Sequence, residues 1–217
     1  MPESSRHRPA AQKILANDVF EPNTIEFILS NCGDGDVVHA GTYFGDFLPA
    51  LAKGVAPGAK IWAFEPNREN YLCAKVTLEI NDIENVILCH AGLGARQENL
   101  LVKTSDKNGR SLGGTSRIIA MESNEVAGTE VVQMVTIDDR GVPERKVSII
   151  QLDVEGHEKE ALTGALKTIK RWLPIIIVEV LPNSTLLSSE WFAENILSLG
   201  YRKINEIHGN SVFACKP

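Results

Sequence analysis

The chain has 217 residues, of which 43% are hydrophobic and 23% are charged, a composition typical of a single globular domain. Its 22 Lys and Arg residues stand against 28 Asp and Glu residues, which gives a formal net charge of −6 at pH 7. A negative net charge opposes binding to phosphate backbones, so we expect no nucleic-acid partner. The sequence shows no apolar run of the ~20 residues that a membrane span needs and no secretory signal, so we expect no membrane partner and a cytoplasmic location.

The four cysteines, Cys32, Cys73, Cys89 and Cys215, are far apart and form no CxxC pair. In a reducing compartment such cysteines are usually small buried hydrophobic residues. The carboxylates near residue 153 could alternatively hold a divalent cation, but they lack the dense spacing of a metal-binding motif. We therefore expect no metal.

Apolar residues at helical spacing predict one or two helices within residues 10–35, and we expect residues 1–9 to be disordered. Further along, short β-branched runs alternate with helical patterns. Strands are expected at 37–40, 60–65, 86–90, 147–153 and 175–180, helices at 47–54, 68–81, 157–169 and 190–199, and a final hairpin at 201–205 and 211–214. The alternation predicts an α/β fold with a Rossmann-like, doubly wound and mostly parallel sheet, covered by helices on both faces and ending in antiparallel strands.

Residues 104–128 interrupt this alternation, between expected strands at 99–103 and 130–137. The segment is rich in Gly, Ser, Thr, Asn and Asp, which is unusual inside a compact domain and typical of lids and binding loops. We interpret it as a substrate-covering loop within a single domain of residues 10–217. A surface excursion without a function is the alternative.

The first expected strand ends in a turn that contains Gly41 and Gly45 and precedes a helix. Glycine lets the backbone turn tightly and approach a ligand, and the following helix offers free N–H groups, so we predict a cofactor loop. The GxxxG spacing differs from the GxGxxG of a dinucleotide site, which weakens the case for an NAD-linked oxidoreductase. A tight turn that binds nothing remains the alternative.

The second expected strand ends at Glu65, followed by Pro66. A carboxylate at this place can accept hydrogen bonds from both hydroxyls of a ribose, because it has two oxygens and a vicinal diol has two donors. Pro66 then fixes the direction in which the chain leaves the strand. The sequence therefore predicts a nucleoside-binding residue at Glu65, with an exposed strand-end glutamate as the alternative.

Three ionisable residues are expected to converge near the end of the sheet, where Asp153 and Glu179 end neighbouring strands and His157 begins a helix. A helix N-terminus disfavours the imidazolium form, so His157 could act as a general base near pH 7. A histidine exposed at a helix end is the alternative. Residues 158–160 are expected to form a solvated helix face.

Four motifs occur in the order found in the FkbM-type methyltransferases, a branch of the class I S-adenosylmethionine-dependent enzymes, which the chain resembles over roughly residues 37–180. The motifs are HAGTYFG at 39–45, FEP at 64–66, VTIDD at 135–139, and LDVEGHE at 152–158 followed by LTGA at 162–165. The resemblance implies a seven-stranded sheet with a reversed final strand, S-adenosylmethionine as cofactor, and O-methylation of a small-molecule hydroxyl, often on a sugar or a natural product.

The resemblance also implies roles for individual residues. The methionine part of the cofactor would lie against the first loop, the ribose against Glu65 and Pro66, the adenine beside the end of the third strand, and the methyl group above Asp153. The cofactor-binding residues implied in this way are His39, Ala40, Gly41, Thr42, Tyr43, Phe44, Gly45, Glu65, Pro66, Ala91, Gly92 and Asp153. His39 stands where the family usually has Asp, and Tyr43 and Phe44 replace smaller residues, so a variant cofactor pose or a non-catalytic cofactor-binding module is an alternative.

Methyl transfer to oxygen is an in-line displacement, so correct positioning of the acceptor can supply ~7–11 kcal/mol of the barrier. Removal of the hydroxyl proton by a base usually contributes a further ~10²- to 10⁴-fold in rate. We expect His157, with Asp153 or Glu179 nearby, to supply this base. The acceptor itself and the oligomeric state cannot be derived from the sequence.

Overall fold

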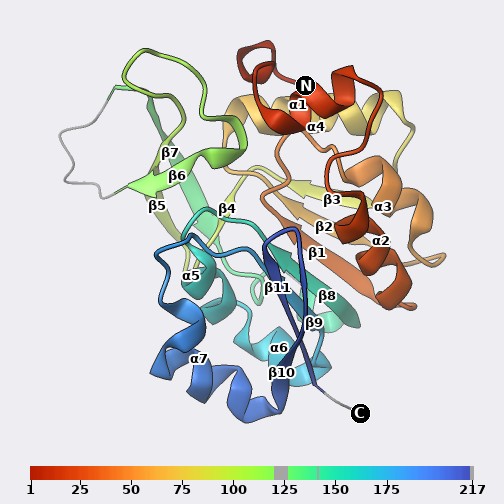
Figure 1. Ribbon diagram of the computed structural model, residues 1–217. Coiled ribbons are helices and arrows are strands. Elements are labelled where there is room, and N and C mark those ends of the chain that lie inside the picture. Colours follow the sequence, from red (N-terminus) through yellow and green to blue (C-terminus); the bar gives the residue numbers. More distant parts are fainter. Residues whose placement is uncertain (120–126, 141, 216–217) are drawn as a thin grey trace.

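The computed structural model describes residues 1–119, 127–140 and 142–215, and Figure 1 shows how their helices and strands are arranged. The main sheet contains β1 (Asp36–Ala40), β2 (Ile61–Phe64), β3 (Val86–Cys89), β8 (Val147–Leu152), β9 (Ile175–Val178), β10 (Tyr201–Ile207) and β11 (Asn210–Cys215). The α-helices are α1 (Pro9–Leu15), α2 (Pro22–Asn31), α3 (Leu48–Gly54), α4 (Arg68–Ile80), α5 (Glu158–Thr163), α6 (Leu166–Trp172) and α7 (Glu190–Asn195). Short 3₁₀ helices lie at η1 (Glu3–Ser5), η2 (Gly113–Thr115), η3 (Val142–Glu144), η4 (Leu186–Ser188) and η5 (Leu197–Leu199).

The main sheet has seven strands in the order β10-β11-β9-β8-β1-β2-β3. Strands β3, β2, β1, β8 and β9 pair in parallel, whereas β11 is antiparallel to β9 and to β10. This confirms the predicted Rossmann-like sheet and its antiparallel end. The strand order reverses between β1 and β8, and ligands of such sheets bind at that point, beyond the carboxyl ends of the strands.

Alternate residues of the central strands pack on opposite faces, because side chains in a strand point to the two faces in turn. On β1, Val37 packs with α2 and α3, while Val38 packs in the cluster that includes residues of α5, α6 and α7. Both residues are fully buried. The centre of the sheet is therefore a middle layer between two layers of helices, which explains why strands such as β2 and β9 consist of apolar residues.

A second, smaller sheet was not predicted. It has the order β4-β7-β5-β6 and contains β4 (Gly92–Leu93), β5 (Glu98–Lys103), β6 (Arg117–Ile119) and β7 (Thr129–Val135). Strand β6 lies within the predicted covering loop of residues 104–128, of which 120–126 lie outside the described residues. The sequence gave no signal for β4 and β6, because they contain two and three residues.

The helix expected at 157–169 is two helices, α5 and α6, that meet at Gly164. A Cβ atom at Gly164 would lie 2.1 Å from the main-chain oxygen of Gly94, so only glycine allows this close approach. The carboxylate of Asp138 accepts hydrogen bonds at 2.9 Å from the main-chain N–H groups of Lys167 and Thr168 at the start of α6. The two family motifs at 135–139 and 162–165 thus hold this helix junction together.

The first nine residues, for which we expected disorder, instead have defined contacts with segments distant in the sequence. Ser5 in η1 is fully buried. The guanidinium of Arg8 donates a hydrogen bond to the main-chain carbonyl of Leu112. These contacts are polar and long-range, so the apolar periodicity used to assign helices could not reveal them.

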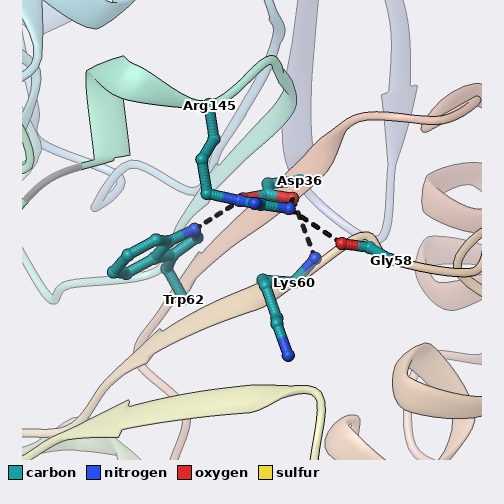
Figure 2. A network of polar contacts seen from close by, with 5 residues as sticks. All are labelled: Asp36, Gly58, Lys60, Trp62 and Arg145. Carbon is teal, nitrogen blue, oxygen red and sulfur yellow. Dashed lines mark hydrogen bonds and ion pairs between the residues drawn. The ribbon is translucent and has the colours of Figure 1, made fainter.

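At the amino ends of the parallel strands, the carboxylate of Asp36 joins three segments of the chain, as Figure 2 shows. Asp36 at the start of β1 accepts hydrogen bonds from Arg145 Nε at 2.6 Å, from Trp62 Nε1 at 2.9 Å and from the main-chain N–H of Lys60 at 2.8 Å. Arg145 also donates to the carbonyl oxygen of Gly58 at 2.8 Å. The Asp36 side chain is 2% exposed, so its charge depends on these donors.

We expect Arg145→Met to lower the free energy of unfolding by about 1.5–3 kcal/mol, because it removes charge-assisted hydrogen bonds from a buried carboxylate. Urea denaturation measures this change. Lys146→Met is the control, since Lys146 pairs with Asp34 at the surface, where an ion pair contributes less than ~1 kcal/mol. Equal losses in the two variants would show that the Asp36 network contributes no more than a surface pair.

Candidate functional site

The turn after β1 approaches the end of β8 unusually closely. Gly41 has a φ of +84°, and a Cβ atom at this position would lie 1.9 Å from the main-chain oxygen of Asp153. The N–H groups of Gly41 and Thr42 both donate to the carbonyl oxygen of Phe64, at 3.2 Å each. The turn is therefore fixed between β2 and β8, and only glycine fits at position 41.

Glu65, directly after β2, is 4% exposed, yet each of its carboxylate oxygens accepts a main-chain hydrogen bond. The N–H of Tyr43 donates to Oε2 at 2.7 Å and that of Asn67 to Oε1 at 2.9 Å. Burial raises the pKa of Glu65 to about 8, although these hydrogen bonds act in the opposite direction. Oε2 keeps a free lone pair for a hydroxyl donor, whereas Oε1 also accepts a long hydrogen bond of 3.4 Å from Asn70 Nδ2, which a second hydroxyl could replace.

Two adjoining cavities open at these strand ends, with empty volumes of ≈ 520 Å³ and ≈ 1070 Å³ including their mouths. Five residues line both cavities and connect them, namely Gly41, Glu65, Gly114, Asp153 and Glu155. The carboxyl ends of β1, β2 and β8 thus meet where the two cavities join, as expected for a sheet whose order reverses there.

The first cavity is mainly apolar. Pro66 and Ala40 line it, and so do Ala91 and Gly92, for which the family resemblance implies a place beside the adenine. The unexpected smaller sheet completes its wall with apolar side chains from β4, β5, β6 and β7, namely Leu93, Val102, Ile118 and Met134. A flat, apolar ligand group such as a purine matches this lining.

The second cavity is strongly acidic. Among the described residues that line it, six carry a carboxyl group and one, Arg8, carries a positive charge. The carboxyl groups belong to Glu21, Asp46, Glu65, Asp153, Glu155 and Glu179. Burial raises the pKa of both Asp46 and Glu155 to about 7. The cavity therefore favours a positively charged ligand.

His39 lies on the wall of the second cavity and is 3% exposed. Burial lowers its pKa to about 4, so the ring is neutral at physiological pH. Its Nδ1 donates to Oε1 of Gln151, which leaves Nε2 as an acceptor, and Nε2 has no partner within the described part of the chain. The ring also stacks on Phe47 with centroids 5.3 Å apart. His39 is thus a neutral hydrogen-bond acceptor on the wall of this acidic cavity.

Asp153 and Glu179 directly follow Leu152 and Val178, which are paired in the neighbouring strands β8 and β9, so the two residues lie side by side as predicted. Burial and the charge of Glu179 raise the pKa of Asp153 well above its ordinary value, and the pKa of Glu179 is raised by burial as well. The pair therefore retains a proton more readily than isolated carboxyl groups do.

The sequence analysis did not single out Glu155, although it lines both cavities. Its φ of +53° is rare for a non-glycine residue, and it forms the turn between β8 and α5. The signal that could have found it was its place beside Gly156, since glycine often marks a turn that brings its neighbours to a ligand.

His157 lines the first cavity, whereas Glu179 lines the second, so Asp153 is the member of the predicted trio that reaches both. Burial lowers the pKa of His157, and its Nδ1 lies 3.6 Å from Oε2 of Glu160. The expectation that residues 158–160 form a solvated face is wrong for Glu158. That side chain is buried and accepts a hydrogen bond at 2.8 Å from the N–H of Gly156.

Three residues of the predicted cofactor loop line neither cavity. The hydroxyl of Thr42 donates to the carbonyl oxygen of His39 at 3.2 Å, and Phe44 packs in a cluster with Tyr43 and residues of α1. Gly45 has a φ of +81°, and a Cβ atom there would lie 3.2 Å from the Cα atom of Ala74. These residues shape the turn, whereas Tyr43 lines the second cavity directly.

The start of the predicted covering loop, in and around η2, lies over both cavities, with Gly114 lining each of them. Asn70 in α4 donates to the carbonyl oxygen of Gly113 at 3.3 Å, and Asn67 donates to the hydroxyl of Ser116 at 3.1 Å. Asn70 also donates to Glu65 at 3.4 Å. The covering segment and the buried carboxylate are thus held by the same helix start.

The sequence of residues 39–202 matches the family model of the methyltransferase FkbM domain, which spans most of the chain and includes β1, β2, β8 and β9. The chain belongs to the FkbM methyltransferase family. The cofactor of this family is S-adenosylmethionine. No curated protein matches the sequence of the chain.

Solved structures with the same fold include other methyltransferases. The methyltransferase FkbM from Methylobacillus flagellatus KT superposes with a TM-score of 0.59 and 19% identity, over 83% of this chain and 43% of that one. This chain therefore spans less than half the length of that protein. An rRNA methylase from Streptococcus thermophilus gives a TM-score of 0.50 and 12% identity, over 90% of this chain and 95% of that one. At these identities the likeness shows the shared fold.

The described residues contain no cluster of three or more His, Cys, Asp or Glu residues that could hold a metal ion. No helix among them has both the length and the apolar character needed to cross a membrane. The cysteines in this part of the chain are free thiols, of which Cys32 and Cys89 are buried and Cys73 and Cys215 are partly buried.

We expect Gly41→Ala to destabilise the fold and to weaken binding of S-adenosylhomocysteine by at least tenfold, because the added methyl group would collide with the main chain at Asp153. Gly58→Ala is a matched control, since Gly58 has a φ of +86° but open space around it. Thermal unfolding and calorimetry separate the two effects. Equal losses in both variants would attribute the cost to backbone conformation alone.

Proposed function

We propose that the protein transfers a methyl group from S-adenosylmethionine to a hydroxyl oxygen of a small molecule, such as a sugar or a natural product. The observation that carries this proposal is the continuous site in which Gly41 and Glu65 line both cavities. An apolar cavity, a buried carboxylate and an acidic cavity follow one another, in the order of an adenine, a ribose and the positively charged sulfonium with its ammonium group. The residues present therefore fit the cofactor.

In this proposal Glu65 accepts the ribose hydroxyls, and the first cavity holds the adenine against Pro66, Ala91 and Gly92. The turn from Gly41 to Gly45 is shaped for the methionine part of the cofactor, and His39 Nε2 is placed to accept a hydrogen bond from its amino group. A neutral imidazole can replace the usual aspartate here, because an ammonium group needs a hydrogen-bond acceptor and the buried Nε2 atom of His39 provides one.

When bound, S-adenosylmethionine supplies an electrophilic methyl group on a positively charged sulfur. The chain must then hold the acceptor and remove its proton. Asp153 is the best placed base, because it reaches both cavities and lies beside Glu179 at the ends of neighbouring strands. A raised pKa makes its ionised form a stronger base, and Glu179 stabilises the proton once it has been taken up. His157, which lines the apolar cavity, is the alternative base.

The acidic second cavity and the net charge of −6 favour a small molecule over nucleic acid as the acceptor. The likeness to an rRNA methylase does not weaken this argument, because one fold supports many substrates. A non-catalytic module that binds the cofactor is a second candidate, favoured by His39 at the usual aspartate position. It would bind S-adenosylhomocysteine without methylating any acceptor.

Glu65→Gln tests the cofactor site. We expect the affinity for S-adenosylhomocysteine, measured by calorimetry, to fall about 10- to 100-fold, because each hydrogen bond to a charged acceptor contributes about 1.5–3 kcal/mol. Glu79→Gln, an exposed change on α4, should leave the affinity unaltered. An unchanged affinity in Glu65→Gln, with the protein folded, would remove the main support for the proposal.

The pH dependence of cofactor affinity gives a second test of Glu65, with the same Glu65→Gln variant. Glu65 in the free protein has a pKa of about 8, so it is mostly protonated at pH 6.5 and increasingly ionised above pH 8. Since the ionised form is the stronger acceptor, wild-type affinity should rise between pH 6.5 and pH 8, and Glu65→Gln should lack this component of the rise. Parallel pH profiles for the two proteins would contradict the role of Glu65.

Asp153→Asn and His157→Ala distinguish the two candidate bases. We expect Asp153→Asn to lower kcat by ~10²- to 10⁴-fold and His157→Ala to lower it by less than threefold. Methyl transfer to a panel of hydroxyl compounds provides the rates, and calorimetry with S-adenosylhomocysteine checks that the cofactor site is intact. The reverse result would assign the base to His157.

A further inference from the structure

Part of the acidic cavity lies outside the segment that defines the family. Glu21, in the turn between α1 and α2, and Asn210, at the start of β11, both line the second cavity. The family match covers residues 39–202, so both residues lie outside the matched segment. These residues therefore are candidates for the part of the site that selects the acceptor.

The three strand ends bring Asn210, Glu179 and Asp153 side by side. Strand β11 pairs with β9 through Ser211 and Val178, so one further step of the register places Asn210 beside Glu179. Glu21 joins this group from the other side, because its Oε2 atom accepts a hydrogen bond from Asn210 Nδ2 at 3.4 Å. A compact group of oxygen atoms thus forms one wall of the cavity.

An unpartnered acceptor lies within this wall. Asn210 is 1% exposed, and its Oδ1 atom has no hydrogen-bond partner among the described residues. A buried amide oxygen without a donor costs free energy, and a ligand that brings a donor recovers it. An ionised carboxylate has no hydrogen to donate, so a ligand that carries a donor is suited to satisfy this oxygen.

The negative charge of this wall also favours a ligand that carries hydrogen-bond donors. Burial, and then the charges of neighbouring carboxylates including Glu21, raise the pKa values of Asp153, Glu179 and Asp46. Arg8 is the one positively charged residue among the described residues that line this cavity, against six carboxyl groups. A cation on the ligand would offset the repulsion between these carboxyl groups, whereas a phosphate or carboxylate would increase it.

We propose that the acceptor is a hydroxylated amine, whose ammonium group binds between Glu21, Asn210 and Glu179 while its hydroxyl faces Asp153. An ammonium group has three donors and no acceptor, which matches a wall of carboxylate and amide oxygens. The inference deepens the proposed function and rests on it. It adds a substrate class, amino sugars or amino alcohols, and two selectivity residues, Glu21 and Asn210.

The test compares ligands that differ at one position. Calorimetry at pH 7.5 measures their binding to the whole protein saturated with S-adenosylhomocysteine. One series is 6-amino-6-deoxyglucose, glucose and glucose 6-phosphate, and the other is glucamine, sorbitol and sorbitol 6-phosphate. We expect the amine of at least one series to bind at least tenfold more tightly than the neutral compound, and the phosphate to bind more weakly than both.

Variants locate the effect. Glu21→Gln and Asn210→Ala should each reduce the preference for the amine at least fivefold and leave binding of S-adenosylhomocysteine unchanged. Glu194→Gln, an exposed change on α7, should change neither. Thermal unfolding checks that each variant is folded, and the ligand series on the wild-type protein does not depend on any variant.

The outcomes separate the two proposals. If S-adenosylhomocysteine binds but the amines do not bind, or bind no better than the neutral compounds, or the phosphates bind best, the inference fails and the cofactor site stands. If an amine preference persists unchanged in both Glu21→Gln and Asn210→Ala, the assigned wall is wrong. If S-adenosylhomocysteine does not bind, the proposed function and the inference fail together.

Discussion

The geometry of the site depends on the hydrogen bonds that one buried carboxylate, that of Glu65, accepts from the backbone. Glu65 accepts the N–H of Tyr43 and that of Asn67, so it joins the turn after β1 to the start of α4. Asn70 extends this link to the segment over the cavities through the carbonyl oxygen of Gly113. A single side chain therefore fixes the cofactor loop and its cover before any ligand arrives, which reduces the entropy lost on binding.

In the free protein, the burial of several carboxyl groups at this site costs electrostatic free energy. Glu65 is buried with a pKa of about 8, and both Asp46 and Glu155 have pKa values of about 7. Carboxyl groups with raised pKa values oppose folding as they ionise, so their presence together is hard to explain by stability alone. The Asp36 network at the other edge of the sheet shows the contrast, since donors surround that carboxylate on several sides.

The sequence predicted the main sheet well because its strands are short apolar runs separated by helical patterns. It also singled out Gly41, Glu65 and Asp153 as residues at strand ends, and the structure brings these three residues together where the two cavities join. The division of the helix at Gly164 was missed because the cause is a contact with the distant residue Gly94. Local periodicity carries no information about such a contact.

The other differences between the predicted and the observed structure also arise from contacts between residues that are distant in the sequence. The smaller sheet depends on pairing between β5 and β7, whose residues are about 30 positions apart, and its outer strand β6 is three residues long. Glu21 and Asn210 reach one cavity from opposite ends of the sequence, and their hydrogen bond joins residues 189 positions apart. The residues at the ends of the parallel strands can be assigned from the sequence. The cavity walls that other segments of the chain contribute cannot.

The chain's first ten residues form part of the cavity wall without belonging to any strand, since Arg8, Pro9 and Ala10 line the second cavity. A segment of this kind can change in length and composition while the sheet and the cofactor loop stay as they are. Divergence among related enzymes could therefore proceed at this margin, with new acceptors arising through exchange of the leading segment and little disturbance of the catalytic framework.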